Sequence, residues 1–185
     1  MTHFGERTLI HRGRKFDFEM VRYRSASGAT IEREVVRHPG AVCILPILEG
    51  EGGVRIVMIR NRRFALGIEL LELPAGTLEK GEEPSICAGR ELIEETGYRA
   101  GSIIPLGSFY TTPGMTDERM HAFAATGLVH VGQDLEEDEQ IRVEVIELAR
   151  VLGMIDSGEL MDAKSIVTLM MGQRRGLIGT RGRGG

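Results

Sequence analysis

The chain has 185 residues, of which 42% are hydrophobic and 27% charged, a composition that suits one globular domain. Its formal net charge of −4 gives no overall electrostatic case for nucleic-acid binding. We expect no membrane association, because no apolar run is long enough to span a bilayer and the N-terminus lacks a signal-peptide pattern. The two cysteines, Cys43 and Cys87, have no CxxC spacing, so we expect reduced thiols and a cytoplasmic location.

Strand-like patterns open the chain. Residues 7–24 alternate loosely between apolar and polar side chains, and residues 30–36 resume this pattern after a Ser/Gly turn. Period two predicts strands, so we expect residues 1–37 to form a small antiparallel sheet. We place the main domain at residues 38–173 and expect residues 174–185, rich in arginine and glycine, to be a flexible tail.

The main domain alternates strand and helix signals. Residues 41–48 (AVCILPIL) form a continuous apolar run, which is typical of a buried strand. Further strands are expected at 54–59, 69–73, 99–108, 120–128 and 141–146, and helices at 84–96, 147–154 and 162–171. A polar segment, 60–63, is expected to follow the strand at 54–59. This order predicts an α/β fold in which a mixed sheet lies between helices.

One stretch carries most of the chemistry: residues 76–98, GTLEKGEEPSICAGRELIEETGY. Glu91 and Glu95 are four residues apart, so on a helix they lie on the same face and repel one another. A hard divalent cation such as Mg²⁺, which prefers oxygen ligands, would relieve that repulsion. Arg90 and Glu94 form an opposite-charge pair at the same spacing. A solvated acidic face is the ordinary explanation of a Glu-rich helix, but it does not account for the stacked pair.

The spacing of this stretch resembles the Nudix box, the catalytic motif of hydrolases that cleave a nucleoside diphosphate linked to another moiety. The matching positions are Gly76, Glu82, Arg90, Glu91, Leu92, Glu94, Glu95, Gly97 and Tyr98. The resemblance implies an α/β/α sandwich in which the box forms loop, helix and loop. It also implies that Mg²⁺, or alternatively Mn²⁺, is held by Glu91, Glu95 and the backbone carbonyl of Ala75. The resemblance further implies that Glu94 takes part in catalysis, either as another metal ligand or as a carboxylate that contacts the ligands. It implies structural roles for Glu82 and Arg90.

A second acidic cluster lies at residues 136–139, EEDE. By composition it is an ordinary solvated loop. In the ADP-ribose pyrophosphatase branch of the Nudix family, however, a loop well after the box supplies the base that activates water. The resemblance therefore implies that Glu137 is the base and Glu139 a metal ligand, and a shift of one or two residues would move both assignments.

Other segments extend the resemblance to that branch over residues 30–171. They include REVVRHPGAV, RNRRFALGIELLELPAG and MDAKSIVTL, together with a proline, Pro113, fifteen residues after the box. We expect Arg63, Arg37 and Pro113 to contact substrate, because a planar guanidinium suits bidentate phosphate binding and Pro113 marks the branch. Glu72 could be a partner of Arg63, of the metal site, or of neither.

The resemblance implies Mg²⁺-dependent hydrolysis of ADP-ribose, to AMP and ribose 5-phosphate, or of a related nucleoside diphosphate sugar. Two alternatives stay open: a Nudix hydrolase for GDP-mannose, a dinucleoside polyphosphate or an oxidised nucleotide, and a non-catalytic Nudix domain that binds ADP-ribose. Relatives are commonly homodimers in which N-terminal strands complete the partner's site, so we expect residues 1–37 to form a dimer.

Overall fold

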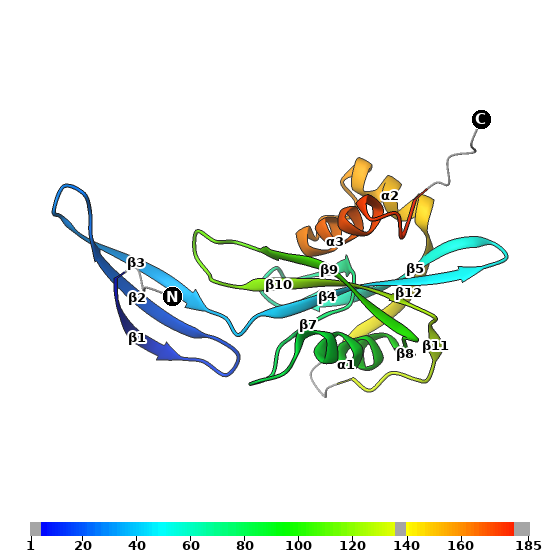
Figure 1. Cartoon of the computed structure of the whole chain (residues 1–185), viewed down its shortest axis with the longest axis horizontal. Helices are drawn as coiled ribbons and strands as arrows, with labels where there is room; N and C mark the ends of the chain where they lie inside the picture. Colours follow the sequence, from blue (N-terminus) through cyan, green and yellow to red (C-terminus); the bar gives the residue numbers. More distant parts are fainter. Residues whose placement is uncertain (1–4, 136–139, 180–185) are drawn as a thin grey trace.

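The computed structural model describes residues 5–135 and 140–179. A three-stranded antiparallel sheet opens the chain, formed by β1 (Glu6–Arg12), β2 (Asp17–Arg24) and β3 (Thr30–Arg37). It projects from one end of the molecule, away from the C-terminal helices (Figure 1). The small N-terminal antiparallel sheet predicted from alternation is therefore confirmed.

The main sheet has seven strands, in the order β12-β5-β4-β10-β9, with β6 paired to β5 and β7 paired to β4. Its strands are β4 (Ala41–Gly50), β5 (Gly53–Arg63), β6 (Ile68–Glu72), β7 (Ala75–Thr77), β9 (Ser102–Tyr110), β10 (Arg119–Thr126) and β12 (Ile141–Glu147). Strand β10 runs parallel to β4, whereas β5 and β7 run antiparallel to it, so the sheet is mixed. A two-stranded sheet joins β8 (Tyr98–Arg99) to β11 (Val129–His130).

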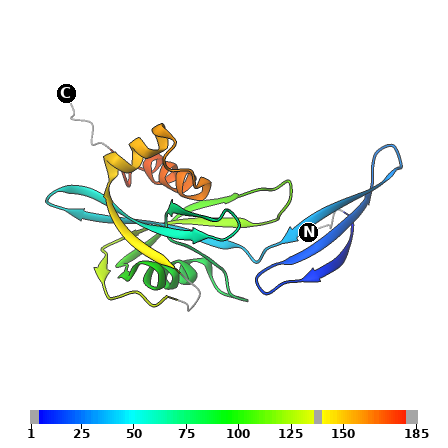
Figure 2. The ribbon, with the colours of Figure 1, turned by 180° about the vertical axis from the view of Figure 1, so that it is seen from behind.

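Helices cover both faces of the main sheet. Helix α1 (Pro84–Thr96) lies on one face, and α2 (Leu148–Ser157) with α3 (Ala163–Arg174) lies on the other, as the front and back views show (Figures 1 and 2). This arrangement confirms the predicted α/β/α sandwich. No helix among the described residues is both long and apolar enough to cross a membrane.

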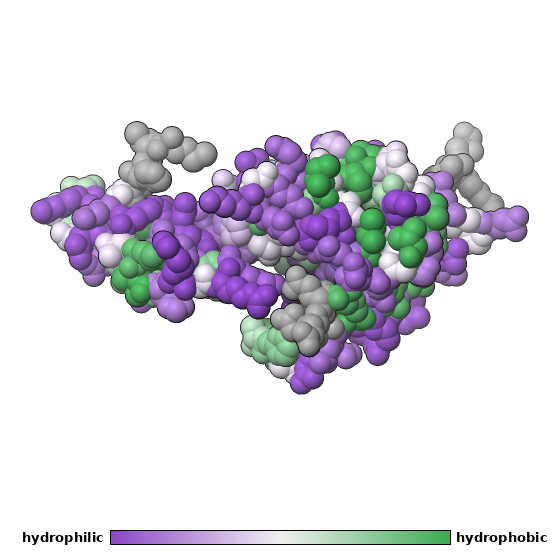
Figure 3. Space-filling view, turned by 90° about the horizontal axis from the view of Figure 1, so that it is seen from below, coloured by the Kyte–Doolittle hydropathy of each residue, from purple (hydrophilic) through white to green (hydrophobic). Residues whose placement is uncertain are grey.

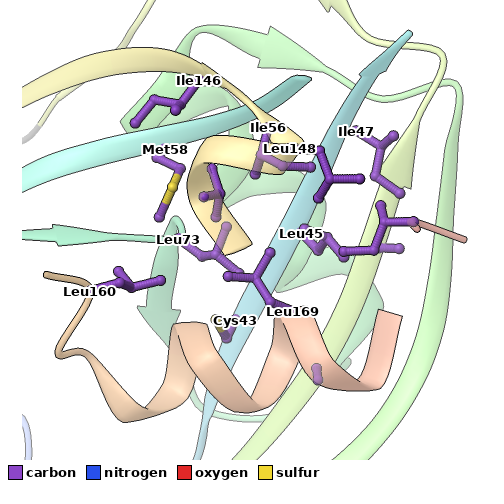
Figure 4. Close-up of a cluster of buried hydrophobic side chains, with 14 of the residues drawn as sticks. Cys43, Leu45, Ile47, Ile56, Met58, Leu73, Ile146, Leu148, Leu160 and Leu169 are labelled. Atoms are coloured by element: carbon purple, nitrogen blue, oxygen red, sulfur yellow. The ribbon is translucent and has the colours of Figure 1, made fainter. Parts of the chain in front are cut away.

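The core is organised around β4, which is buried on both faces. Cys43, Leu45 and Ile47 point into the larger cluster, which α2 and α3 close (Figure 4). Val42 and Ile44 point to the opposite side, where they pack with Leu92 of α1. This two-sided burial explains the continuous apolar run of the sequence, since a strand with one wet face would alternate. Both cysteines are free and buried, as expected.

Two expectations about the chain's polar segments need correction. Residues 60–63 are not a loop after a strand, because β5 continues to Arg63 and β6 supplies backbone partners along it. The expected flexible tail also begins too early. Arg174 is the last residue of α3, the Leu177 N–H donates to the Gly172 carbonyl at 3.1 Å, and Ile178 is only 3% exposed. Leu177 and Ile178 thus pack against the core.

The face of the molecule seen in Figure 3 is mostly hydrophilic, with separate hydrophobic patches. One patch lies on the N-terminal sheet, where Leu9, Ile10 and Phe16 are exposed. Another group of exposed apolar side chains, Phe64, Leu66 and Ile68, lies at the turn between β5 and β6.

Candidate active site

Helix α1 carries Glu91, Glu94 and Glu95 of the box, and its ends are set by the local sequence. Pro84 takes the first helical position, where its missing N–H costs no hydrogen bond. Gly97 ends the helix in the left-handed conformation, with φ of 73°, and its N–H donates to the Ile93 carbonyl at 2.8 Å. Residues 87, 88, 91, 92, 95 and 96 form the buried face. Glu91 and Glu95 therefore lie on the side of the helix that faces the protein.

Arg90 connects three glutamates. Its Nε and Nη2 each donate to Glu82 at 3.0 Å, and its Nη1 donates to both Glu91 and Glu94 at 2.8 Å. The hydrogen bond with Arg90 lowers the pKa of Glu82 to about 2, and the same bond raises the pKa of Arg90. The pairing with Glu82 has the bidentate form expected of a structural role. The contact with Glu91 corrects our reading of the sequence, which had given Arg90 only Glu94 as its partner.

Glu91 packs against the backbone at Gly76. A Cβ atom built on Gly76 would lie 1.8 Å from the carboxyl carbon of Glu91 and 1.9 Å from its Oε1. Any larger side chain at this position would force the Glu91 carboxylate to move, so the glycine of the box permits this close approach. Glu91 is 8% exposed, which places an acidic group in a nearly dry position beside the loop.

Glu95 contacts the backbone of β7 at Ala75, the residue before Gly76. The Ala75 N–H donates to Glu95 Oε2 at 2.8 Å, and Glu95 is 3% exposed. Pairing of Ala75 with Cys43 in β7 and β4 fixes the backbone at this point. The structure therefore places Glu95 against Ala75 and Glu91 against Gly76. The metal-ligand roles expected of Glu91, Glu95 and the Ala75 carbonyl stay predictions.

Glu137 and Glu139, predicted as base and metal ligand, lie outside the described residues. The chain just before them runs along the end of α1. The Gln133 side-chain amide donates to the Glu95 carbonyl at 2.7 Å, and the Asp134 N–H donates to the Glu94 carbonyl at 3.1 Å. The segment that leads into the acidic cluster thus starts at the turn of α1 that carries Glu94 and Glu95.

The NUDIX domain family matches residues 37–165, which include the box, the main sheet, α1, α2 and the first residues of α3. The chain belongs to the Nudix family. An ADP-ribose pyrophosphatase of Bacillus subtilis (strain 168) is 40% identical over 158 residues, which are 84% of each chain. A methanol dehydrogenase activator of Bacillus methanolicus is 37% identical over 172 residues, or 90% of this chain and 91% of the relative. The crystal structure of an ADP compounds hydrolase shares the fold, with a TM-score of 0.78 and 21% identity over 92% of this chain and 91% of its own.

The Nudix site offers oxygen donors of the kind that Mg²⁺ and Mn²⁺ prefer. Two carboxylates, from Glu91 and Glu95, lie buried beside the backbone of Ala75. Within residues 5–135 and 140–179, no three His, Cys, Asp or Glu side chains are arranged to hold a metal ion by themselves. The donor chemistry fits a divalent cation, and the remaining positions suit water, substrate oxygens or a carboxylate from the acidic loop.

Arg63 lies at the end of β5, and Glu72 of β6 holds it. Arg63 Nε donates to Glu72 Oε1 at 2.6 Å, and Nη2 donates to Oε2 of the same carboxylate. Glu95 contributes to the raised pKa of Arg63, after the hydrogen bond with Glu72. Arg63 is therefore within electrostatic reach of the box. The contacts also show which of the roles left open for Glu72 it takes, because Glu72 is the partner of Arg63.

Arg37 and Pro113 lie at the junction between the N-terminal sheet and the main domain. Arg37 Nη1 donates to Asp117, and the His38 N–H donates to Asp117 Oδ1 at 2.9 Å. Pro113 is exposed in the same loop, which also pairs with β3 through the Val36 N–H and the Met115 carbonyl at 2.8 Å. Arg37 also borders a cavity of about 370 Å³ lined by Arg12, Gly13, Arg14, Lys15, Phe16, Asp17, His38 and Pro39.

The sequence reading missed two contacts that shape the site. It gave no role to Asp117, which joins the loop of Pro113 to Arg37, and none to Lys164, which donates to Glu72. Asp117 is separated from Arg37 by 80 residues and Lys164 from Glu72 by 92, so no local pattern connects them. For Asp117, a carboxylate in a turn-rich loop was the only available signal.

Proposed function

We propose that this Nudix domain hydrolyses the pyrophosphate of ADP-ribose, or of a related nucleoside diphosphate sugar. ADP-ribose would give AMP and ribose 5-phosphate. The observation that carries the proposal is the pair of buried carboxylates, Glu91 and Glu95, held against the backbone of Ala75 and Gly76. The 40% identity with an ADP-ribose pyrophosphatase over most of both chains supports this substrate class.

The chain's residues divide the work of the reaction. Glu91, Glu95, Glu139 and the Ala75 carbonyl would hold Mg²⁺ or Mn²⁺, which would supply positive charge to neutralise the phosphates and to acidify the attacking water. Glu137 accepts the proton of the attacking water. The water oxygen bonds to one phosphorus as the bond from that phosphorus to the bridging oxygen breaks, and the other phosphate keeps the bridging oxygen. Arg63 contacts a phosphate, and Glu94 supports the metal-binding carboxylates.

The nucleoside part of the substrate suits the cavity beside the N-terminal sheet. Arg12, Arg14, Lys15 and Arg37 make its lining basic, which favours an anionic ligand. The rings of Phe16 and His38 stack with their centroids 6.2 Å apart, and both line this cavity. A base or ribose could pack against these rings while the guanidinium groups, including that of Arg37, meet phosphate. Pro113 lies in the loop that fixes this junction.

The chain is proposed to work as a homodimer through its N-terminal sheet, residues 1–37. Exposed apolar side chains on this sheet, Leu9, Ile10 and Phe16, support the proposal, because a sheet that covers no core of its own gains from a partner. Light scattering of the purified protein should give twice the mass of the chain, and Ile10→Glu should halve it. A wild-type mass equal to one chain would exclude the dimer.

The reducing cytoplasm is the proposed location. Cys43 and Cys87 are both buried free thiols, which fits a compartment that keeps thiols reduced.

A substrate panel tests the function. Purified protein with Mg²⁺ should hydrolyse ADP-ribose, and GDP-mannose, a dinucleoside polyphosphate and an oxidised nucleotide should be compared with it. Glu95→Gln should lower kcat at least about hundredfold, since it removes a metal-ligand charge. Glu83→Gln, at an exposed position just before the same helix, is the matched control. Binding of ADP-ribose without turnover of any nucleotide would instead support a regulatory Nudix domain.

A further inference from the structure

Glu72 is a fully buried carboxylate at the end of β6. It is 0% exposed, and two cations contact it: Arg63, through Nε and Nη2, and Lys164, through Nζ. Burying a carboxylate is costly unless it is ion-paired and hydrogen-bonded. Both oxygens of Glu72 accept such bonds, so the cluster meets that requirement.

The two cations keep their charges in this buried place. The hydrogen bond with Glu72 raises the pKa of Arg63, and this effect is larger than the opposing effect of burial. Burial by itself would lower the pKa of Lys164, but Asp162 and Glu72 together outweigh it and raise that pKa. Arg63 and Lys164 are therefore protonated at neutral pH.

Arg63 and Glu72 differ in their access to solvent, and the difference gives the pair a direction. The Arg63 side chain is 39% exposed, whereas that of Glu72 is completely covered. The bidentate pairing uses Nε and Nη2 of Arg63, and Nη1 is not part of it. Glu72 thus holds the guanidinium from the protein side and leaves its outer edge for an anion.

Lys164 and its neighbours fix Glu72 from behind. Lys164 Nζ also donates to Asp162 at 2.9 Å, and Asp162 caps α3 by accepting the Ser165 N–H at 3.1 Å. The Ser165 hydroxyl in turn accepts the Leu73 N–H at 2.6 Å. The start of α3 is therefore tied to the strand that carries Glu72 and leads into Ala75.

We propose that Glu72 is a positioning residue for hydrolysis: it orients the Arg63 guanidinium toward a substrate phosphate, and Lys164 keeps the Glu72 carboxylate in place. This role rests on the proposed function, because it takes Arg63 as the phosphate contact. A guanidinium fixed in one orientation loses little freedom when it binds a phosphate, and a released one loses more.

The test compares Glu72→Gln, Arg63→Ala and the double variant in kcat, KM and calorimetric binding of a methylene-bridged ADP-ribose analogue. Glu72→Gln should raise KM and weaken analogue binding by about tenfold, because its amide cannot accept both bonds of the fork. In the Arg63→Ala background, the same change should alter either value by less than about twofold. Glu144→Gln, which loses a 2.6 Å pair with Arg60 on β5, is the control for losing an Arg–Glu pair and should stay near wild type.

Thermal melting shows whether each variant is folded. If Glu72→Gln fails to fold, Lys164→Gln replaces it, and KM should rise by about threefold because Glu72 loses one of its two anchors. The positioning role would be overturned if the folded Glu72→Gln variant kept the wild-type KM and analogue affinity. It would also be overturned if the effects of Glu72→Gln and Arg63→Ala on these values multiplied in the double variant. In either case, turnover by the wild-type protein would still support the proposed function. Analogue binding without turnover would refute hydrolysis. The binding constants of the Glu72→Gln, Arg63→Ala and double variants would still show whether Glu72 orients Arg63 toward the ligand. A wild-type protein that neither binds nor hydrolyses refutes both.

Discussion

The carboxylate of Glu91 lies directly against the backbone of Gly76, with no room for a methyl group between them. Gly76 in strand β7 and Glu91 on helix α1, fifteen positions apart in the box, thus form one packing unit. The glycine supplies space rather than an unusual backbone angle, since Gly76 is absent from the glycines of positive φ.

Gly76→Ala should therefore disable the site. Its Cβ would fall 1.8 Å from the Glu91 carboxyl carbon, so Glu91 must move, and we expect kcat to fall at least about hundredfold. Gly89→Ala is the matched control, because a Cβ there meets nothing within 4 Å and the position is helical. That control should keep its activity and gain about 0.5–1 kcal/mol of stability. Full activity of Gly76→Ala would contradict the assigned position of Glu91.

The Glu82–Arg90 pair should make stability depend on acid pH. The pKa of Glu82 falls from 4.5 to about 2 on folding, so its contribution is complete above 4.5 and is lost as pH falls from 4.5 toward 2. Glu82→Gln should cost about 1–2 kcal/mol in urea unfolding at pH 7, and the difference from wild type should shrink across that window. Glu83→Gln, which is exposed, should show no such trend. A difference that stays constant down to pH 2.5 would argue against the pair.

Asp117→Ala should loosen the N-terminal sheet. The variant loses the bonds from Arg37 and from the His38 N–H, at an expected cost of about 1–3 kcal/mol. Trypsin should then cleave after Arg37 faster than in wild type, which a time course would measure. Glu32→Ala removes an exposed ion pair with Arg22 on the same sheet and should leave cleavage there unchanged. Equal cleavage rates for wild type and Asp117→Ala would show that the junction is held by other contacts.

Ile178→Ala should destabilise the whole domain. Ile178 is 3% exposed in the larger core cluster, so its truncation leaves a cavity worth about 2 kcal/mol or more. Chemical unfolding would measure this loss. Ile86→Ala is the control, because Ile86 is 66% exposed on α1 and should change stability by less than about 0.5 kcal/mol. Equal stabilities of the two variants would mean that the chain end does not contribute to the core.

Local patterns in the sequence were enough to predict the fold. The apolar run in β4 indicated burial on both faces, and Pro84 with Gly97 gave the limits of α1. Asp162 caps α3 by accepting the Ser165 N–H, a contact between residues three positions apart. Each of these depends on residues close in sequence, where spacing fixes geometry.

Contacts between distant segments could not be predicted in the same way. The spacing placed Glu91 and Glu95 on one face of α1. The contact between Glu91 and Gly76, however, depends on how β7 packs beside that helix. The contact of Arg63 with Glu72 runs diagonally across β5 and β6, where Glu72 is paired with Ile59 and not with Arg63. Lys164 reaches Glu72 from a helix 92 residues later. Ile178 was missed because its glycine- and arginine-rich surroundings favour a loose tail.

The bridge that Arg90 forms among Glu82, Glu91 and Glu94 has a consequence for metal exchange. Arg90 offsets part of the repulsion within the box by pairing with Glu82, Glu91 and Glu94. A cation that binds Glu91 must share that carboxylate with a guanidinium or displace it, which reduces the net free energy of binding. We therefore expect a dissociable activator, so that the rate of hydrolysis follows the free concentration of the ion around the protein.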